Sequence, residues 1–132
     1  MAEEIPVGGR SEGDRSLLLV DDDDVLRERL ARAMERRGFQ VATRPSVASG
    51  NAAAREKPPA FAVVDLRLAD GSGLDVVAAL RDVRPDTRIV MLTGYGNIAT
   101  AVAAVKAGAV DYLAKPADAD DIEAALLAWA DE

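Results

Sequence analysis

The 132-residue chain contains no cysteine and no histidine. Without cysteine it has no thiol nucleophile and no thiol-based redox sensor. Without histidine it has no His-based catalytic triad, and the lack of both residues excludes zinc sites of the Cys/His type. Chemistry at the chain's own side chains must therefore use carboxylates, hydroxyls, lysines or the backbone.

Long apolar runs and an excess of positive charge are also missing. No apolar run approaches the roughly 18 residues that span a membrane, and the acidic N-terminus lacks the basic-then-apolar pattern of a signal peptide. The 16 Lys and Arg residues against 23 Asp and Glu give a net charge of -7, which repels nucleic-acid phosphates. We therefore expect a cytoplasmic protein that binds neither a membrane nor nucleic acid directly.

The length fits one domain of ordinary size. Residues 1–16 are rich in charge and carry no periodic apolar pattern, which predicts a flexible N-terminal tail. The folded domain is expected over residues 17–130. Nothing after Trp129 could form a DNA-binding helix-turn-helix, so we expect no effector domain in this chain.

Short apolar runs alternate along the chain with segments of helical periodicity. The runs predict strands at residues 17–20, 39–43, 61–64, 89–92 and 110–113. Helices are predicted at 26–38, 46–57, 74–82, 97–107 and 118–130, with Pro or Gly near several of their ends. This alternation is typical of a doubly wound α/β fold, in which right-handed crossovers place helices on both faces of a parallel sheet.

Polar side chains follow four of the predicted strands. They are Asp21 and Asp22 after the first strand, Asp65 after the third, Thr93 after the fourth and Lys115 after the fifth. Each has a purely structural alternative: an acidic helix start or cap for the aspartates, a turn for Thr93 and a solvated surface position for Lys115. However, the carboxyl ends of parallel strands meet at one edge of the sheet, so we expect all five side chains together.

Three converging carboxylates repel one another and favour a bound cation. A hard divalent ion such as Mg²⁺, held by carboxylates, a carbonyl and water, would supply the missing positive charge. Lysine adds a second positive charge, and the threonine hydroxyl adds a hydrogen-bond donor. The set predicts a phosphoryl-transfer site with a carboxylate nucleophile.

Four ordered stretches carry a resemblance to a known family. They are Leu-Leu-Leu-Val-Asp-Asp at 17–22, Val-Val-Asp-Leu-Arg-Leu at 63–68, Met-Leu-Thr-Gly at 91–94 and Asp-Tyr-Leu-Ala-Lys-Pro at 111–116. Over residues 17–127 the chain resembles the receiver domain of two-component response regulators. Residues 31–38 and 93–118 are similar in particular to the RegA/PrrA/ActR type, redox-responsive global regulators of proteobacteria. The resemblance implies a (βα)5 flavodoxin-like fold, with a five-stranded parallel sheet in the order 2-1-3-4-5.

The resemblance also implies a role for each site residue. Asp65 would accept the phosphoryl group, and Lys115 would contact it, with a cis peptide bond between Lys115 and Pro116. The implied cofactor is Mg²⁺, bound directly by Asp22, Asp65 and the backbone carbonyl of Arg67, and by Asp21 through a water molecule. Thr93 and Tyr112 would form the switch pair.

By resemblance the protein is a phosphorylation-activated signalling switch. It is not an enzyme beyond self-catalysed phosphoryl transfer and autodephosphorylation. Because the chain has no histidine, the phosphohistidine donor must be another protein, by resemblance a sensor histidine kinase. The first helix is expected to present a charged face to it, and the alternative is a solvated face with i,i+4 ion pairs. That face comprises Arg27, Glu28, Arg32, Glu35 and Arg36.

The helix at 97–107 is expected to form part of the output surface, because it carries almost no charge. We expect Ile98, Val102 and Val105 to pack on the sheet and the remaining positions to form a smooth partner surface. Those positions are Ala99, Thr100, Ala101, Ala103 and Ala104. Phosphorylation would then promote homodimerisation, or contact with an effector domain that controls transcription, through the fourth helix, fifth strand and fifth helix. The alternative is that alanine occurs in the helix at 97–107 only for its high helix propensity.

Two departures from the receiver pattern and two rival functions accompany this prediction. Ala69 stands where many receivers have Pro, which makes the loop after Asp65 harder to predict. Gly94 stands where many have a small residue such as Ala, which adds backbone freedom to the loop after the fourth strand. One rival is a phosphatase of the haloacid-dehalogenase type, with Asp21 as nucleophile in an Asp-x-Asp motif. The other is a receiver-like module that binds partners without phosphorylation.

Overall fold

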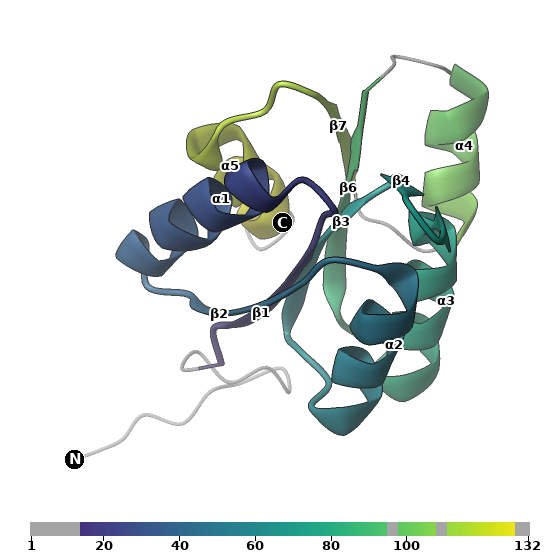
Figure 1. The fold of residues 1–132 in the computed structure, drawn as a ribbon, viewed down its shortest axis with the longest axis horizontal. Coiled ribbons are helices and arrows are strands. Elements are labelled where there is room, and N and C mark those ends of the chain that lie inside the picture. The colour runs from purple at the N-terminus through teal and green to yellow at the C-terminus, as the bar shows by residue number, and fades with distance from the viewer. Residues whose placement is uncertain (1–13, 95–97, 108–110, 129–132) are drawn as a thin grey trace.

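The computed structural model describes residues 14–94, 98–107 and 111–128, which form a parallel sheet between two layers of helices (Figure 1). Its strands, in spatial order, are β2 (Gln40–Arg44), β1 (Ser16–Val20), β3 (Phe61–Asp65), β6 (Arg88–Thr93) and β7 (Asp111–Ala114). One face carries α1 (Asp24–Arg36) and α5 (Ala119–Leu127), and the other carries α2 (Val47–Glu56), α3 (Gly73–Val83) and α4 (Ile98–Ala107). The predicted α/β class and the strand order 2-1-3-4-5 are confirmed.

The first strand begins one residue earlier than predicted. β1 starts at Ser16 rather than Leu17, and the Arg15 carbonyl already accepts a hydrogen bond from the Gln40 amide at 2.8 Å. Asp14 forms an ion pair with Arg84 at 2.8 Å. Most of the predicted tail lies outside the described residues, as do Asn97, residue 110 and the predicted helix end at 129–130.

The core consists of two clusters, one on each face of the sheet. Val20, Val64 and Met91 belong to the cluster under α2 and α3, whereas Leu19 and Val63 belong to the cluster under α1 and α5. Successive strand residues alternate between the two clusters because side chains alternate across a pleated sheet. Both faces are covered, so the central strands are apolar along most of their length, with polar residues at their ends.

Helix α1 follows directly from its sequence signals. The Asp23 side chain caps its amino end by accepting a hydrogen bond from the Leu26 amide at 3.0 Å. Gly38, with a φ of +95°, follows its carboxyl end, and the Gly38 amide donates to the Glu35 carbonyl at 3.0 Å. Leu30 and Met34 are buried against the sheet. The helix therefore starts beside the carboxylates at the end of β1.

A small hairpin after β3 was missed by the sequence analysis. Its strands, β4 (Arg67–Leu68) and β5 (Gly71–Ser72), are two residues each and pair antiparallel. Leu68 is buried in the core, whereas the turn residues Ala69 and Asp70 are exposed. Strands this short carry no readable alternation pattern, so the sequence predicts only a loop between Asp65 and α3.

The expected orientation of α4 is wrong for two residues. Val102 and Val105 do not pack on the sheet, because 46% and 56% of their surfaces are exposed. Ala103 is half-buried and, with Ala99, lines a groove facing the β4–β5 hairpin. A helix made almost wholly of small apolar residues has no polar stripe to mark its outer side. The side chains of Ile98, Thr100, Ala101 and Ala104 lie outside what the structure describes.

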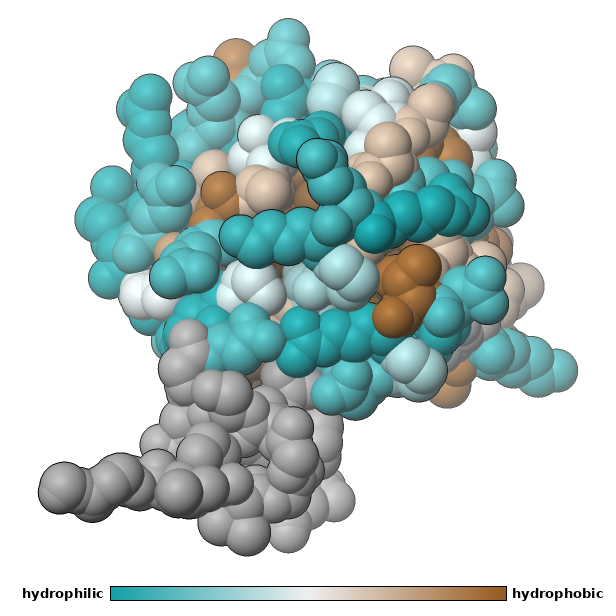
Figure 2. Space-filling model, turned by 90° about the horizontal axis from the view of Figure 1, so that it is seen from below, coloured by the Kyte–Doolittle hydropathy of each residue, from teal (hydrophilic) through white to brown (hydrophobic). Residues whose placement is uncertain are grey.

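The surface is mainly hydrophilic. Seen from below in the orientation of Figure 1, polar side chains dominate the molecule and apolar ones are scattered among them (Figure 2). Within the described ranges, none of the helices combines the length and apolar character needed to cross a bilayer.

Candidate functional site

Three carboxylates meet at the carboxyl edge of the sheet, as predicted. Asp21 and Asp22 follow β1, and Asp65 is the last residue of β3. Each offers an oxygen within 4.8 Å of the others. Asp21 is fully buried and Asp65 is 5% exposed, whereas Asp22 is exposed to solvent. The cluster thus has a buried floor and one carboxylate at its open rim.

The Lys115 ammonium group connects two of these carboxylates. It follows β7 and donates a hydrogen bond to Asp65 Oδ2 at 2.9 Å, while Asp21 Oδ2 lies 3.3 Å away. The Lys115 amide also donates to the Thr93 carbonyl at 2.7 Å, which fixes the base of the lysine against β6. The Lys115-Pro116 peptide bond is cis, as expected. Lys115 therefore reaches the carboxylates from the opposite side of β3 from Asp21.

Burial and neighbouring charges shift the pKa values of Asp65 and Lys115. Burial raises the pKa of Asp65, and the neighbouring negative charge of Asp21 raises it further, against the lowering effect of Lys115. Burial alone would lower the pKa of Lys115, but its hydrogen bond and ion pairs with Asp65 and Asp21 outweigh burial and raise it. Lys115 therefore remains a cation at neutral pH and is the main compensating charge among the described residues.

The site suits a divalent cation. The buried Asp21 Oδ2 atom has no hydrogen-bond partner among the described residues, since the Lys115 ammonium beside it is not aligned for one. Lys115 pairs with Asp21 and Asp65 only, and the third carboxylate, Asp22, lies beside them, which leaves an excess of negative charge in the cluster. Oxygen ligands of this kind are those that Mg²⁺ prefers. Asp21, Asp22 and Asp65 therefore fit the implied metal.

Thr93 and Tyr112 lie on the same face of the sheet. Thr93 is the buried last residue of β6 and pairs with Ala114 of β7, whereas Tyr112 pairs with Met91. Residues two apart on a strand point to one side, so Thr93 and Tyr112 both face the layer of α2, α3 and α4. Tyr112 is half-buried against the core cluster there.

The segment after Asp65 passes very close to the start of α3. The Gly73 amide donates to the Leu66 carbonyl at 2.7 Å, and the Leu66 amide donates to the Leu92 carbonyl at 2.8 Å. A Cβ atom on Gly73 would lie 2.1 Å from the backbone oxygen of Asp65. The Arg67 amide donates to Asp65 Oδ1 at 3.3 Å, so Arg67 also lies at the site.

Arg27 differs from its expected position. Its side chain is only 15% exposed, donates to the Asp21 carbonyl at 2.7 Å and pairs with Asp24 at 2.7 Å. It therefore supports the acidic loop and does not belong to the outer face of α1. Glu28, Arg32, Glu35 and Arg36 are exposed as expected. The Asp24–Arg27 spacing of three residues was the one sequence signal for this contact.

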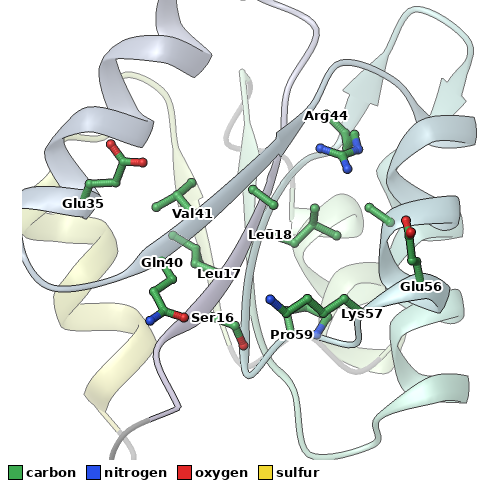
Figure 3. A pocket seen from close by; sticks show the side chains of 12 residues that line it. Ser16, Leu17, Leu18, Glu35, Gln40, Val41, Arg44, Glu56, Lys57 and Pro59 are labelled. Atoms are coloured by element: carbon green, nitrogen blue, oxygen red, sulfur yellow. The ribbon is translucent and has the colours of Figure 1, made fainter.

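A pocket elsewhere contains none of the predicted site residues. It has a volume of about 590 Å³ and surrounds the edge strand β2. Figure 3 shows Glu35 on its α1 side and Glu56 on its α2 side, with Arg44 and Lys57 between β2 and α2. Mixed charges and aliphatic side chains line it, without a cluster of acidic ligands. The strand-end carboxylates remain the candidate functional site.

The fold and this site define a class of protein: a doubly wound α/β domain with an acidic, lysine-containing site at the carboxyl edge of its sheet. Residues 17–127 match the family described as the response regulator receiver domain, and the chain belongs to that family. Its members are signalling domains and not classical enzymes, and they interact with sensor kinases and effector domains.

Curated relatives specify the likeness further. The photosynthetic apparatus regulatory protein RegA of Cereibacter sphaeroides is 69% identical over 115 residues, covering 87% of this chain and 62% of that protein. The acid tolerance regulatory protein ActR of Rhizobium meliloti is 68% identical over 114 residues, covering 86% of this chain and 59% of that protein. These identities confirm the predicted likeness to RegA and ActR. The chain spans about three-fifths of the length of these relatives.

Solved structures show the same fold. A response regulator from Burkholderia pseudomallei, described with a phosphorylated aspartic acid, a calcium ion and citrate, is 47% identical with a TM-score of 0.82. That alignment covers 86% of this chain and 66% of the other. A CheY-like receiver domain from Methanospirillum hungatei is 26% identical, also with a TM-score of 0.82, covering 89% of this chain and 94% of the other.

The haloacid-dehalogenase alternative does not fit these findings. The third residue of its Asp21-Asp22-Asp23 motif caps α1 instead of facing the cluster. Phosphatases of this type also carry a late acidic pair at a strand end, whereas here Asp120 and Asp121 lie in the first turn of α5, where Asp121 belongs to a capping box. Family membership agrees with this geometry, since the match is to receivers.

Proposed function

We propose that this domain is a phosphorylation-activated switch that accepts a phosphoryl group on Asp65 from a sensor histidine kinase. One observation carries the proposal. Asp65 is held 2.9 Å from the Lys115 ammonium, in a cluster whose other members are Asp21 and the exposed Asp22. The nucleophile therefore has a fixed cation on one side and an open, acidic rim on the other.

The transfer is an in-line displacement. A carboxylate oxygen of Asp65 attacks phosphorus, a P–O bond forms, and the P–N bond to the donor's histidine breaks. The imidazole leaves with the bonding electron pair and takes a proton from solvent. Lys115 offsets charge on the phosphoryl oxygens, and the Thr93 hydroxyl donates to one of them.

A Mg²⁺ ion would be held by the Asp22 and Asp65 carboxylates, the Arg67 carbonyl and, through water, Asp21. When bound, it supplies positive charge that lowers repulsion between the carboxylates and the incoming phosphoryl group. The exposed position of Asp22 leaves that side of the cluster open to solvent and to the donor.

The same proposal covers the change of state after transfer. Thr93 moves toward the phosphoryl oxygen, and the Tyr112 ring turns into the space that Thr93 leaves. Both residues already face the α4 layer, and Tyr112 is only half-buried, so the ring has room to move. The two states then differ at α4, β7 and α5.

The kinase surface is proposed to be the outer face of α1 beside α5. A hollow there has apolar residues and the exposed Arg29, Arg32 and Arg36 in its lining, together with Pro116, next to the phosphate-binding lysine. Arg27 is excluded from this face because it supports the Asp21 loop. The docked donor histidine would lie above the open rim of the cluster.

The proposed setting is a cytoplasmic regulator of transcription, because the relatives are regulatory proteins that extend beyond the aligned region. DNA binding would belong to an effector domain, whether on a longer form of this chain or on a partner. The division of the chain into a tail at residues 1–16 and a receiver domain at residues 17–130 is also part of this proposal.

Mg²⁺ should stabilise the domain, because it binds the folded cluster and has no site in the unfolded chain. At roughly ten times its dissociation constant, the gain is about 1.4 kcal/mol, or a few degrees in melting temperature. Thermal melts with and without Mg²⁺ measure this gain, and acetyl phosphate measures transfer under the same conditions.

Asp22→Ala removes one proposed ligand and one repelling charge. It should melt at or above the parent without metal, lose the Mg²⁺ response and accept phosphate slowly. Asp82→Ala removes an exposed carboxylate on α3 and should keep the full response. A parent that takes phosphate equally well without Mg²⁺, or an Asp22→Ala variant with the full response, contradicts the proposed metal site. A parent that takes no phosphate supports the phosphorylation-independent module.

Phosphorylation should promote homodimerisation, or contact with an effector, through α4, β7 and α5. The exposed Val102 and Val105 provide the apolar part of this surface, whereas Ala103 is half-buried in the groove toward the hairpin. In sedimentation, beryllofluoride should shift the parent to a dimer. Val102→Glu should stay monomeric, and Ala78→Glu, an exposed change on α3, should dimerise. A dimer that tolerates Val102→Glu would refute this surface.

A further inference from the structure

The turn of the β4–β5 hairpin bonds to a helix that is distant in sequence. Asp70 Oδ1 accepts a hydrogen bond from the Val47 amide at 2.8 Å, and Oδ2 accepts one from the Ala48 amide at 3.1 Å. These amides belong to the first turn of α2, whereas Asp70 lies five residues after the phosphoacceptor. The Asp70 carboxylate therefore links the segment that follows Asp65 to the first turn of α2.

Asp70 completes the amino end of α2. The first four amides of a helix have no partner within it. Ser46 and Ser49 satisfy two of them in a capping box, in which each side chain bonds the other residue's amide. The other two belong to Val47 and Ala48, and both bond Asp70. Its pKa is held below the ordinary value by these two amides, so the carboxylate is ionised at neutral pH.

The hairpin is fixed at its base by separate contacts. The Leu66 amide bonds the Leu92 carbonyl, and the Gly73 amide bonds the Leu66 carbonyl. Between these points, Arg67 pairs with Ser72 and Leu68 pairs with Gly71. The tip has one hydrogen-bonded attachment to the rest of the fold among the described residues, the Asp70 carboxylate. Arg67 lies between the fixed base and this attached tip.

We propose that Asp70 is a positioning residue for the phosphoacceptor site: by bonding the amino end of α2, it holds the β4–β5 hairpin, and with it Arg67, whose carbonyl would bind the metal. The inference rests on the proposed function, in which Arg67 supplies a backbone ligand. Groups that orient metal ligands affect binding strongly, and their loss typically weakens metal affinity about 10- to 100-fold. Asp70 touches neither metal nor phosphate and acts through the hairpin.

The test compares Asp70→Ala with Ser46→Ala by calorimetric titration with Mg²⁺ and by the initial rate of labelling from acetyl phosphate. Both variants remove a cap from α2, but among the described residues the Ser46 side chain forms hydrogen bonds only with Ser49 and none with the hairpin. We expect Asp70→Ala to bind Mg²⁺ about tenfold more weakly and to label more slowly at low Mg²⁺. Ser46→Ala should melt lower but keep the parent's Mg²⁺ affinity.

Asp70→Asn retains one acceptor oxygen and should fall between the parent and Asp70→Ala, which guards against a folding defect in the alanine variant. Parental Mg²⁺ affinity in Asp70→Ala, or equal losses in Asp70→Ala and Ser46→Ala, would overturn the positioning role. Failure of the proposed function looks different, because the parent itself would then take no phosphate on Asp65.

Discussion

Asp65→Asn is expected to abolish phosphoryl uptake while the domain stays folded. The change removes the attacking carboxylate oxygen at nearly constant volume. Burial raises the pKa of Asp65, so its negative charge opposes folding at neutral pH, and a neutral amide relieves that cost. Intact mass after incubation with acetyl phosphate and Mg²⁺ should show the phosphorylated species for the parent and none for the variant.

A matched variant separates loss of the nucleophile from loss of charge. Asp82→Asn makes the same chemical change at an exposed position of α3 and should label like the parent. Circular dichroism melts of both variants should be cooperative. Labelling of Asp65→Asn at the parental level would place the phosphoryl group on another residue and refute the assignment.

Gly73→Ala is expected to destabilise the domain strongly. The new Cβ atom would lie 2.1 Å from the Asp65 carbonyl oxygen and 2.9 Å from Val64 Cγ1. The first of these neighbours is backbone of a central strand, which cannot turn away as a side chain can. Overpacking of this kind costs about 1–3 kcal/mol and sometimes more. Because the strain falls on Asp65 itself, labelling should also slow in the fraction that remains folded.

Gly94→Ala provides the control for this change. A Cβ atom at Gly94 would have nothing within 4 Å, and its φ lies outside the range that favours glycine. The free energy of unfolding of Gly94→Ala should stay within about 0.5 kcal/mol of the parental value. Urea unfolding of the two variants measures the contrast. Equal stabilities would mean that α3 does not pass Asp65 as closely as the structure shows.

The positions of the site residues could be predicted because they depend on strand ends. Four apolar runs mark β1, β3, β6 and β7, and the residue after each run is fixed by the end of its strand. Parallel strands bring those ends to one edge, so Asp21, Asp65, Thr93 and Lys115 were placed without any knowledge of their contacts. The glycine that follows the end of α1, Gly38, likewise depends only on neighbouring residues.

Contacts between distant segments could not be predicted in this way. Asp70 bonds residues more than 20 positions away, and no periodicity connects a turn to a helix start. The closeness of Gly73 to Asp65 arises from the hairpin between them, whose two-residue strands carry no pattern. The orientation of α4 was mispredicted because Val102 and alanines differ too little in polarity to mark a buried side.

The most direct test of the account is to locate the phosphoryl group on the chain. After incubation with acetyl phosphate and Mg²⁺, borohydride reduction converts a phosphorylated aspartate to homoserine, which tandem mass spectrometry can locate. The account predicts homoserine at Asp65 alone. Homoserine at Asp21 or Asp22, or none at any position, would contradict it.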